Sequence, residues 1–400
     1  MQALLKKIQG DRVIWMLTLL LSLLSILAVY SSVSALSFKN ETSSNWYLLK
    51  HTIMFGLGFA VMYVVHRIRF KYFSRVAQIA YIVAAVVLLL TLILGPERNE
   101  AKRWLEIPFI GLTIQTSDFA KIALIAYVAR LLNTHRTRLH DFRNGVVPIL
   151  IPIVVICGLI LPANFSTAAM LAAVCLLMMF LGGVPIKHMM RIGGYAVVLL
   201  ALVFTLGKSF PNVFNRLGTW TSRIENFVSP EASADGNYQA KFAQVAIYKG
   251  GILPNGPGTS LARNYLPHSY SDMIYAFIIE EYGALFGGLG LVMVYLIFLF
   301  RCIRNAIRCP QHFGGLLTLG ISFSLVTQAL VNMAVSVRLF PMTGQPLPLV
   351  SMGGTSIIFT CFAIGMVLSV SRSVHNAEEY QKEGAEDPIS SNEIKNAYVA

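Results

Sequence analysis

Leu266–Gly283 reads LPHSYSDMIYAFIIEEYG and places three carboxylates, Asp272, Glu280 and Glu281, at and just inside the start of a long apolar segment. A charge inside a bilayer costs roughly 2.5–3.5 kcal/mol on insertion scales, so such residues occur where they face a protein interior or an aqueous cavity. Asp272 is the carboxylate best placed to meet a substrate that arrives from the water side. We interpret it as the candidate catalytic base of a membrane enzyme, with Glu280 and Glu281 in supporting positions.

The composition around this segment is typical of a polytopic membrane protein. Of the 400 residues, 56% are apolar and only 13% are charged, and a membrane-spanning helix needs about 20 mostly apolar residues. Ten such stretches are centred near Leu23, Leu57, Val86, Ile125, Val155, Val174, Leu199, Leu289, Ser324 and Ile364. We therefore expect an all-α protein with about ten transmembrane helices in residues 1–372, followed by a polar tail, residues 373–400, that we expect to be disordered.

The distribution of charge argues against nucleic acid as a partner, although the net charge is +13. Most of the 32 Lys and Arg residues fall in loops that lie on one side of the membrane if the N-terminus is inside. This excess fits the positive-inside rule and predicts that both termini are cytoplasmic. The same assignment places the long loop, about residues 209–272, outside. All five cysteines fall in spans or on the cytoplasmic side, so no disulfide framework is expected.

The long loop has its own predicted structure. Tyr238, Phe242, Val245 and Ala246 recur at helical spacing, which predicts an amphipathic helix at the membrane surface. A glycine-rich turn, residues 250–258, follows this helix. A loop of this length is usually functional or disordered, and the mixture of aromatic and basic residues favours function.

Two motifs precede and open the fourth apolar segment. The first, AKRW, holds Lys102, Arg103 and Trp104; paired cations beside an interfacial aromatic suit a phosphate at headgroup level, and a membrane-anchoring basic patch is the alternative. The second, QTSDFAK, begins at Gln115 and contains an acidic and a basic residue, Asp118 and Lys121.

Asp118 and Lys121 of the second motif are three residues apart and therefore share one face of a helix. They are interpreted either as a structural ion pair or as a direct substrate contact, and the two roles are compatible.

Two further segments interrupt the apolar pattern. Residues 162–167, PANFST, favour a tight turn between two short spans. Arg338–Gly354, RLFPMTGQPLPLVSMGG, contains three prolines and three glycines, which rule out a continuous helix. Non-helical backbone at membrane depth is tolerated where it lines a cavity or is buried in protein, so Ser351, Gly353 and Gly354 are supporting candidates. The sequence contains no Walker loop, dinucleotide fingerprint, HExxH or GxSxG, which argues against ATP-driven transport and serine hydrolysis.

Together these segments resemble the SEDS family of bacterial membrane proteins (shape, elongation, division and sporulation), which includes FtsW and RodA, over residues from the first span to about Arg372. AKRW is similar to the family's GA(K/R)RW, and QTSDFAK to QPSEFAK. LPHSYSDMIYAFIIEEYG resembles LPEAHTDFIFAIIGEELG, and PMTGQPLPLVSMGGTS resembles PVTGLPLPFISYGGSS. The chain departs from the family at Asn164, where PDxGT would have an aspartate. The overall pattern looks like the FtsW branch.

The resemblance implies a peptidoglycan glycosyltransferase of the bacterial cytoplasmic membrane that polymerises lipid II at its outer face during cell division. It implies a class B penicillin-binding protein and other division-complex membrane proteins as partners, and it places the family's catalytic aspartate at Asp272. The anionic diphosphate of lipid II requires cations, and the implied set comprises Lys102, Arg103, Lys121, Arg216, Arg223 and Lys249, with Trp104 at the interface.

Three alternatives and a cofactor question remain open at this point. A lipid II flippase would present a similar groove and similar buried charges, and a RodA-type polymerase would act in elongation. A mainly structural recruiter in a division complex would depend on its tail and loops and would not need Asp272. A divalent cation, Mg²⁺ or Mn²⁺, could assist departure of the diphosphate, although the sequence shows no complete metal site.

Overall fold

The computed structural model describes residues 9–39, 44–96, 102–106, 113–209, 217–228, 238–260 and 271–386, most of which are helical. The α-helices are α2 (Arg12–Lys39), α3 (Ser44–Arg67), α4 (Lys71–Leu94), α5 (Thr116–Thr134), α6 (Val147–Ile160), α7 (Phe165–Leu181), α8 (Ile186–Ser209), α9 (Leu217–Val228), α10 (Tyr238–Gly250), α12 (Ile274–Tyr282), α13 (Gly290–Arg308), α14 (His312–Ser336) and α15 (Thr355–Glu386). The shorter elements are strands β1 (Trp104–Glu106) and β2 (Thr113–Gln115), the 3-10 turn η1 (Arg136–Arg138), and the π-helical segments η2 (Phe142–Val146) and η3 (Gly283–Leu289).

The predicted polytopic helical fold is confirmed. Each of the ten apolar stretches falls inside a helix of the described chain. Seven helical stretches among the described residues are long and apolar enough to cross a membrane, and α7, with 17 residues, is a shorter apolar helix. Helix α5 is continuous, but its apolar sequence is interrupted by three charged residues, Asp118, Lys121 and Arg130.

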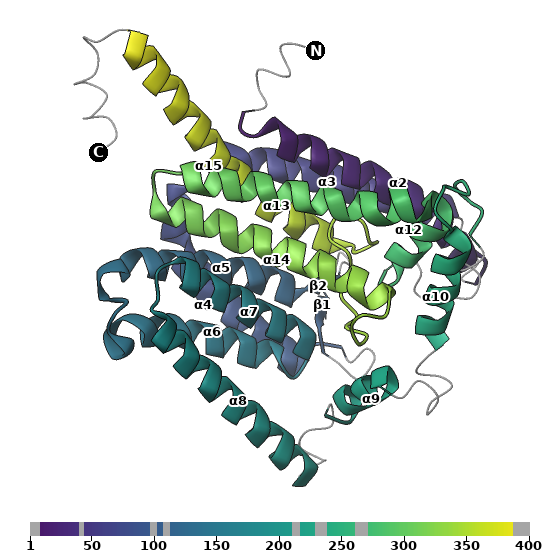
Figure 1. Cartoon of the computed structure of the whole chain (residues 1–400), viewed down its shortest axis with the longest axis horizontal. Helices are drawn as coiled ribbons and strands as arrows, with labels where there is room; N and C mark the ends of the chain where they lie inside the picture. The colour runs from purple at the N-terminus through teal and green to yellow at the C-terminus, as the bar shows by residue number, and fades with distance from the viewer. Residues whose placement is uncertain are drawn as a thin grey trace.

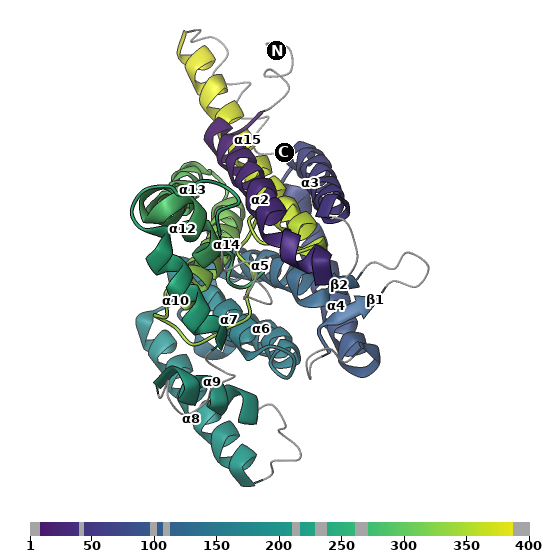
Figure 2. The ribbon, with the colours of Figure 1, turned by 90° about the vertical axis from the view of Figure 1, so that its right-hand side faces the viewer.

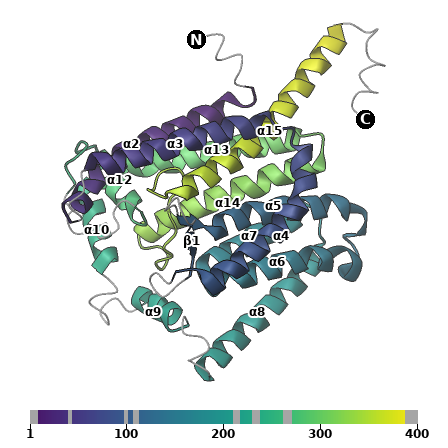
Figure 3. The ribbon, with the colours of Figure 1, turned by 180° about the vertical axis from the view of Figure 1, so that it is seen from behind.

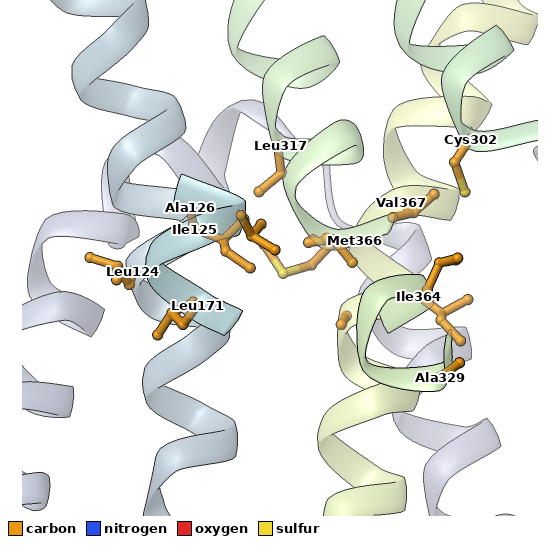
Figure 4. Close-up of a cluster of buried hydrophobic side chains, with 14 of the residues drawn as sticks. Leu124, Ile125, Ala126, Leu171, Cys302, Leu317, Ala329, Ile364, Met366 and Val367 are labelled. Carbon is orange, nitrogen blue, oxygen red and sulfur yellow. The ribbon is translucent and has the colours of Figure 1, made fainter. Parts of the chain in front are cut away.

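Helix α14 forms the centre of the bundle. It packs against α13 and α15 on one side and against α5 and α7 on the other, as the ribbon shows from the front and from behind (Figures 1 and 3). The cluster in Figure 4 shows this contact, where Leu124 of α5, Leu171 of α7, Leu317 of α14 and Met366 of α15 converge. The small Gly320 of α14 permits the approach, because a Cβ there would lie 2.5 Å from Met178 Sδ.

The two ends of the bundle differ in what they carry. At one end of the bundle, α2 begins, α13 ends and α15 leaves the bundle. At the opposite end lie α10, the start of α12 and the β1–β2 pair (Figures 1 and 2). Helix α15 continues to Glu386, so helical structure extends beyond residue 372, where we placed the end of the membrane domain. Residues 387–400 of the predicted tail lie outside the described residues.

The long loop contains the predicted helix, and small residues form the face of this helix that packs on the rest of the protein. Helix α10 packs on α12 through Ala243, Ala246 and Gly250, whereas Val245 is 47% exposed. Of the residues that predicted the helix, Ala246 therefore lies in the contact with α12, and Val245 lies outside it on the protein surface. The physical reason is that small residues allow α10 to approach α12 closely: a side chain at Gly250 would collide with the carbonyl of Ile279.

The long crossing from α12 to α13 is broken at Gly283. This residue adopts a φ of 73°, and a Cβ there would lie 2.6 Å from the main chain of Leu253. Both constraints require glycine. The break ends α12 directly after Glu280 and Glu281 and lets the glycine-rich turn pack against it, since Ala284 N–H donates to Gly251 O at 2.9 Å.

Candidate functional site

Asp272 lies directly before α12, at the end of the bundle that also carries α10 and the hairpin. Its side chain is half-buried and accepts a hydrogen bond from Ser271 Oγ at 2.9 Å. Its backbone is fixed from two other segments: Asn332 Nδ2 of α14 donates to Asp272 O at 2.9 Å, and Ser351 Oγ, from the segment between α14 and α15, donates to Ser271 O at 2.7 Å. The carboxylate is therefore held on a rigid support while part of it remains accessible.

The segment between α14 and α15, residues 337–354, passes over Asp272. It is non-helical, as the prolines and glycines predicted. Gly344 has a φ of 64°, and a Cβ at this position would lie 3.6 Å from Asp272 Oδ2. Leu349, a residue with a Cβ, also has a positive φ of 62°, a conformation that persists only where the surroundings enforce it. The segment is thus a fixed wall of the Asp272 site.

Arg223 approaches the same wall from α9. Its Nη1 donates to Met342 O at 3.2 Å. Burial lowers the pKa of the Arg223 guanidinium from its ordinary value, and the charge of Asp272 acts in the opposite direction. Since an arginine stays charged in proteins, the structure brings a cation and a carboxylate from two distant parts of the sequence close enough to influence each other electrostatically.

A chain of polar side chains connects the fourth predicted span to this wall. Lys121 Nζ lies 2.9 Å from Asp118 Oδ1 and donates to Gln328 Oε1 at 3.1 Å. Gln328 Nε2 in turn donates to Pro346 O at 2.8 Å. Asp118 and Lys121 therefore form the ion pair that their spacing predicted, and the pair also supports the segment that covers Asp272.

Asn332 and Gln345 extend this network, and we did not single out either residue from the sequence. Asn332 Nδ2 donates to Gln345 O at 2.7 Å, and Gln345 Nε2 donates to Thr167 Oγ1 at the start of α7. Gln328, Asn332 and Ser336 are spaced four residues apart within an apolar span. Such a polar face inside a span is a signal that could have revealed them.

The predicted turn at residues 162–167 is present between α6 and α7. Asn164 Oδ1 accepts a hydrogen bond from Thr167 N at 3.2 Å and caps α7. The side chain of this residue, which stands where the resembling family has an aspartate, thus satisfies a helix N-terminus.

Glu280 and Glu281 face the glycine-rich turn and the residues that follow it. Glu281 Oε1 accepts hydrogen bonds from Gly258 N at 2.8 Å and from Ser31 Oγ, and the backbone oxygen of Glu281 accepts from the amides of Asn255 and Gly256, both at 3.0 Å. Glu280 Oε2 accepts from Ser260 Oγ. Both carboxylates are buried and organise the turn.

Glu281→Ala is expected to loosen this turn without changing the Asp272 site directly. The substitution leaves the Gly258 N–H and the Ser31 hydroxyl without their acceptor, which costs about 1–3 kcal/mol. Limited trypsin digestion should cut after Lys249, which directly precedes the turn, several times faster than in the parent protein, and the melting temperature should fall. The matched control is Glu225→Ala, which removes an exposed carboxylate of α9. Equal digestion rates for the parent and Glu281→Ala would contradict this role.

Lys102, Arg103 and Trp104 of the AKRW motif lie at the open end of the β1–β2 pair, away from its connecting turn. Trp104 pairs in register with Gln115, Arg103 Nε donates to Ala163 O at 2.9 Å, and Lys102 Nζ donates to Ile93 O at 3.1 Å. Lys102 and Arg103 also line a small cavity of about 20 Å³ with Asn164. The motif therefore ties the β1–β2 pair to the ends of α4 and α6.

The remaining predicted residues are more scattered. Lys249 is exposed at the C-terminal end of α10. Ser351 Oγ accepts from Leu347 N at 2.7 Å, and Gly354, with a φ of 52°, follows Gly353 just before α15. Arg216 lies outside the described residues. Among the described residues, no group of three or more His, Cys, Asp and Glu side chains could hold a metal ion.

The fold and this site define a class: a multi-pass helical membrane protein with a carboxylate and a cation held at the water-facing end of its bundle. The model of the FtsW, RodA and SpoVE family, described as "Cell cycle protein", matches residues 11–376. The chain belongs to this family, the one that its motifs resemble.

Individual relatives agree over nearly the whole chain. The "Probable peptidoglycan glycosyltransferase FtsW" of Hydrogenovibrio crunogenus is 31% identical over 361 residues, which cover 88% of this chain and 89% of that protein. The "Probable peptidoglycan glycosyltransferase FtsW" of Trichlorobacter lovleyi is 30% identical over 90% of this chain and 93% of that protein. "Stage V sporulation protein E" of Bacillus subtilis is 29% identical over 92% of this chain and 98% of that protein.

Solved structures show the same fold. A chain of the structure described as "Structural coordination of polymerization and crosslinking by a peptidoglycan synthase complex" matches with a TM-score of 0.74 at 23% identity, over 91% of this chain and 98% of that one. The rod shape determining protein RodA of Thermus thermophilus matches with a TM-score of 0.64 at 22% identity, over 91% of this chain and 97% of that one.

Proposed function

We propose that this chain is a peptidoglycan glycosyltransferase that polymerises lipid II into glycan strands at the outer face of the bacterial inner membrane during cell division. The observation that carries this proposal is the position of Asp272, which is half-buried, rigidly supported by Asn332 and Ser351, and covered by the segment to which Arg223 is hydrogen-bonded. Membership of the family and the names of its FtsW relatives support the type of reaction.

In the proposed reaction, the 4-hydroxyl of the acceptor sugar attacks the anomeric carbon of the donor. The new carbon–oxygen bond forms as the bond from the anomeric carbon to the diphosphate breaks. Asp272 takes the hydroxyl proton, and a general base of this kind contributes about 10²–10⁴-fold to the rate. The diphosphate leaves with the bonding electron pair, and Arg223 stabilises its charge from across the site.

The other predicted cations are assigned to the diphosphate-linked lipid before reaction. Lys249 is exposed near the glycine-rich turn, and Lys102 and Arg103 lie at the hairpin, where the headgroup would enter from the membrane. Lys121 already contacts Asp118 and Gln328, so its effect on the substrate is expected to pass through the wall that Gln328 supports. If a divalent cation, Mg²⁺ or Mn²⁺, assists the leaving group, it would take most of its ligands from the diphosphate and water.

A class B penicillin-binding protein is the proposed partner, together with other membrane proteins of the division complex. The support is the fold shared with a chain of a peptidoglycan synthase complex that coordinates polymerization with crosslinking. Helix α8 diverges from the rest of the bundle (Figure 1) and exposes apolar side chains such as Met190, Val197 and Val198, so its surface is available to lipid or to a partner's membrane helix.

Purified protein, with its transpeptidase partner, tests the proposal on fluorescent lipid II in detergent and in liposomes. We expect glycan polymers, resolved as a ladder on a gel, in both settings. Movement of lipid II across the liposome membrane without any polymer would favour the flippase alternative instead. Absence of both activities from a folded complex would favour the recruiter.

The membrane orientation gives a separate prediction. Tyr248 of α10 and Ile307 of α13 are 88% and 77% exposed and lie at opposite ends of the bundle. In a background without the five native cysteines, an impermeant thiol reagent should label Tyr248→Cys on intact cells, because the charge rule places the long loop outside. Ile307→Cys should be labelled only after the membrane is permeabilised, and the reverse pattern would overturn the orientation.

A further inference from the structure

A cavity of about 400 Å³ opens at the end of the bundle opposite Asp272. It lies where α2 begins, where α13 ends and where α15 leaves the membrane-spanning part of the chain. Its charged lining consists of Asp11, Arg12, Arg301, Arg304, Arg308 and His375. The lining thus contains four arginines and only one carboxylate. The proposed polymerase chemistry does not use these arginines.

The single carboxylate is already satisfied by the protein. Asp11 is buried, and its Oδ2 accepts from Arg301 Nε at 2.8 Å and from Asn305 Nδ2 at 3.0 Å. Its Oδ1 accepts from Val13 N at 2.9 Å, and its own N–H donates to Ser371 Oγ at 2.9 Å. Asp11 thus joins α2, α13 and α15 and neutralises Arg301, so it is not available to the other arginines.

The rest of the lining keeps an excess of positive charge. Arg12, Arg304 and Arg308 are all exposed, and neither Arg12 nor Arg304 makes an ion pair within the described parts of the chain. With four arginines and one aspartate, the lining carries a formal charge of +3 when His375 is neutral. Guanidinium groups converging on a cavity match the oxygens of a phosphate group, which they bind in a bidentate way.

The position of the cavity further restricts the class of ligand that it could bind. Its lining residues lie at the ends of three candidate membrane spans, Arg12–Ser32, Ile274–Arg308 and Thr355–His375, which is the level of lipid headgroups. Basic pockets between membrane helices at this level bind anionic headgroups. We propose that this cavity is a binding site for a phosphate-bearing anion on the membrane face opposite Asp272, supplied either by an anionic phospholipid headgroup or by a soluble phosphate compound.

The test measures the thermal unfolding midpoint of the purified full-length protein as a ligand is titrated. The probes are short-chain phosphatidylglycerol, phosphatidylcholine of the same chain length, and glycerol phosphate. Arg304→Gln removes one cation and leaves the Asp11 contacts intact, and Arg12→Gln with Arg304→Gln removes two. The matched control is Arg138→Gln, an exposed arginine of η1 that does not line the cavity.

We expect phosphatidylglycerol to raise the midpoint, with half-saturation weakened about fivefold by one substitution and about 25-fold by two. Phosphatidylcholine should have no effect, and Arg138→Gln should behave as the parent protein. A shift by glycerol phosphate as well would assign the site to a soluble phosphate, and a shift by the lipid alone would assign it to the headgroup.

Three outcomes would overturn the proposal. The first is a midpoint that none of the three probes changes. The second is a phosphatidylglycerol response that is equal in the parent and in the double variant. The third is a shift caused by an acidic peptide of residues 376–400 and by neither phosphate, which would assign the cavity to the chain's own C-terminal segment.

Discussion

Asp272→Asn is expected to lower the rate of lipid II polymerisation by about 10²–10⁴-fold while the protein folds and inserts normally. The amide keeps the shape of the carboxylate and can still accept the hydrogen bond from Ser271 Oγ. The bonds that hold the backbone here, from Asn332 and Ser351, do not involve the side chain. The substitution removes the capacity to take a proton and the negative charge that acts on Arg223, but no hydrogen bond that supports the fold, so the loss should appear in the rate and not in the melting temperature.

The measurement is the initial rate of glycan formation from fluorescent lipid II, with the partner transpeptidase present at equal concentration in every sample. Asp141→Asn is the matched control, since it changes an exposed aspartate near η2 that can still act as a cap. Asp272→Glu, which restores a base at a displaced position, should recover part of the activity. A rate for Asp272→Asn within about twofold of the parent, at an unchanged melting temperature, would remove Asp272 from the chemistry.

Lys121→Met is expected to destabilise the protein by about 3–5 kcal/mol, because it leaves Asp118 as an uncompensated buried charge. Asp118 is only 5% exposed, and among the described residues its Oδ2 has no hydrogen-bond partner. The double variant Asp118→Asn with Lys121→Met removes both charges and should regain most of that stability. Polymerisation should nevertheless remain lost, because Gln328 no longer has the donor that links it to α5.

Two measurements on the same four proteins decide this prediction. Thermal unfolding compares the parent, each single variant and the double variant, and the double variant should melt closer to the parent than Lys121→Met does. The polymerisation rate is then measured for the variants that fold. If the double variant is well folded and polymerises normally, Asp118 and Lys121 are only a structural pair.

The sequence alone predicted the features that depend on local pattern. Apolar length and the charge distribution identified ten helical segments, and the prolines and glycines of residues 338–354 predicted the break between α14 and α15. The spacing of Asp118 and Lys121 placed them on one helix face, and the ion pair, one of the two roles considered for them, is present.

Contacts between distant segments could not be predicted in the same way. Arg223 and Asp272 were both candidates, but nothing in their spacing indicates that α9 folds back onto the residue 342 carbonyl. The amide network around Asn332 was missed because each amide alone looks like an ordinary polar residue in a span. The roles of Ala243 and Gly250 in packing α10 against α12 were not predicted, because aromatic residues dominate the apparent pattern of that helix.

The Asn332 amide also holds two segments of the chain at once. A primary amide has two N–H donors. The Asn332 amide donates to the carbonyl of Asp272 and to the carbonyl of Gln345. Aspartate and leucine lack both donors, and glutamine would carry them one methylene too far. Both acceptors are backbone carbonyls, so a substitution at position 332 would release the segment that carries Asp272 and the segment that carries Gln345 at the same time.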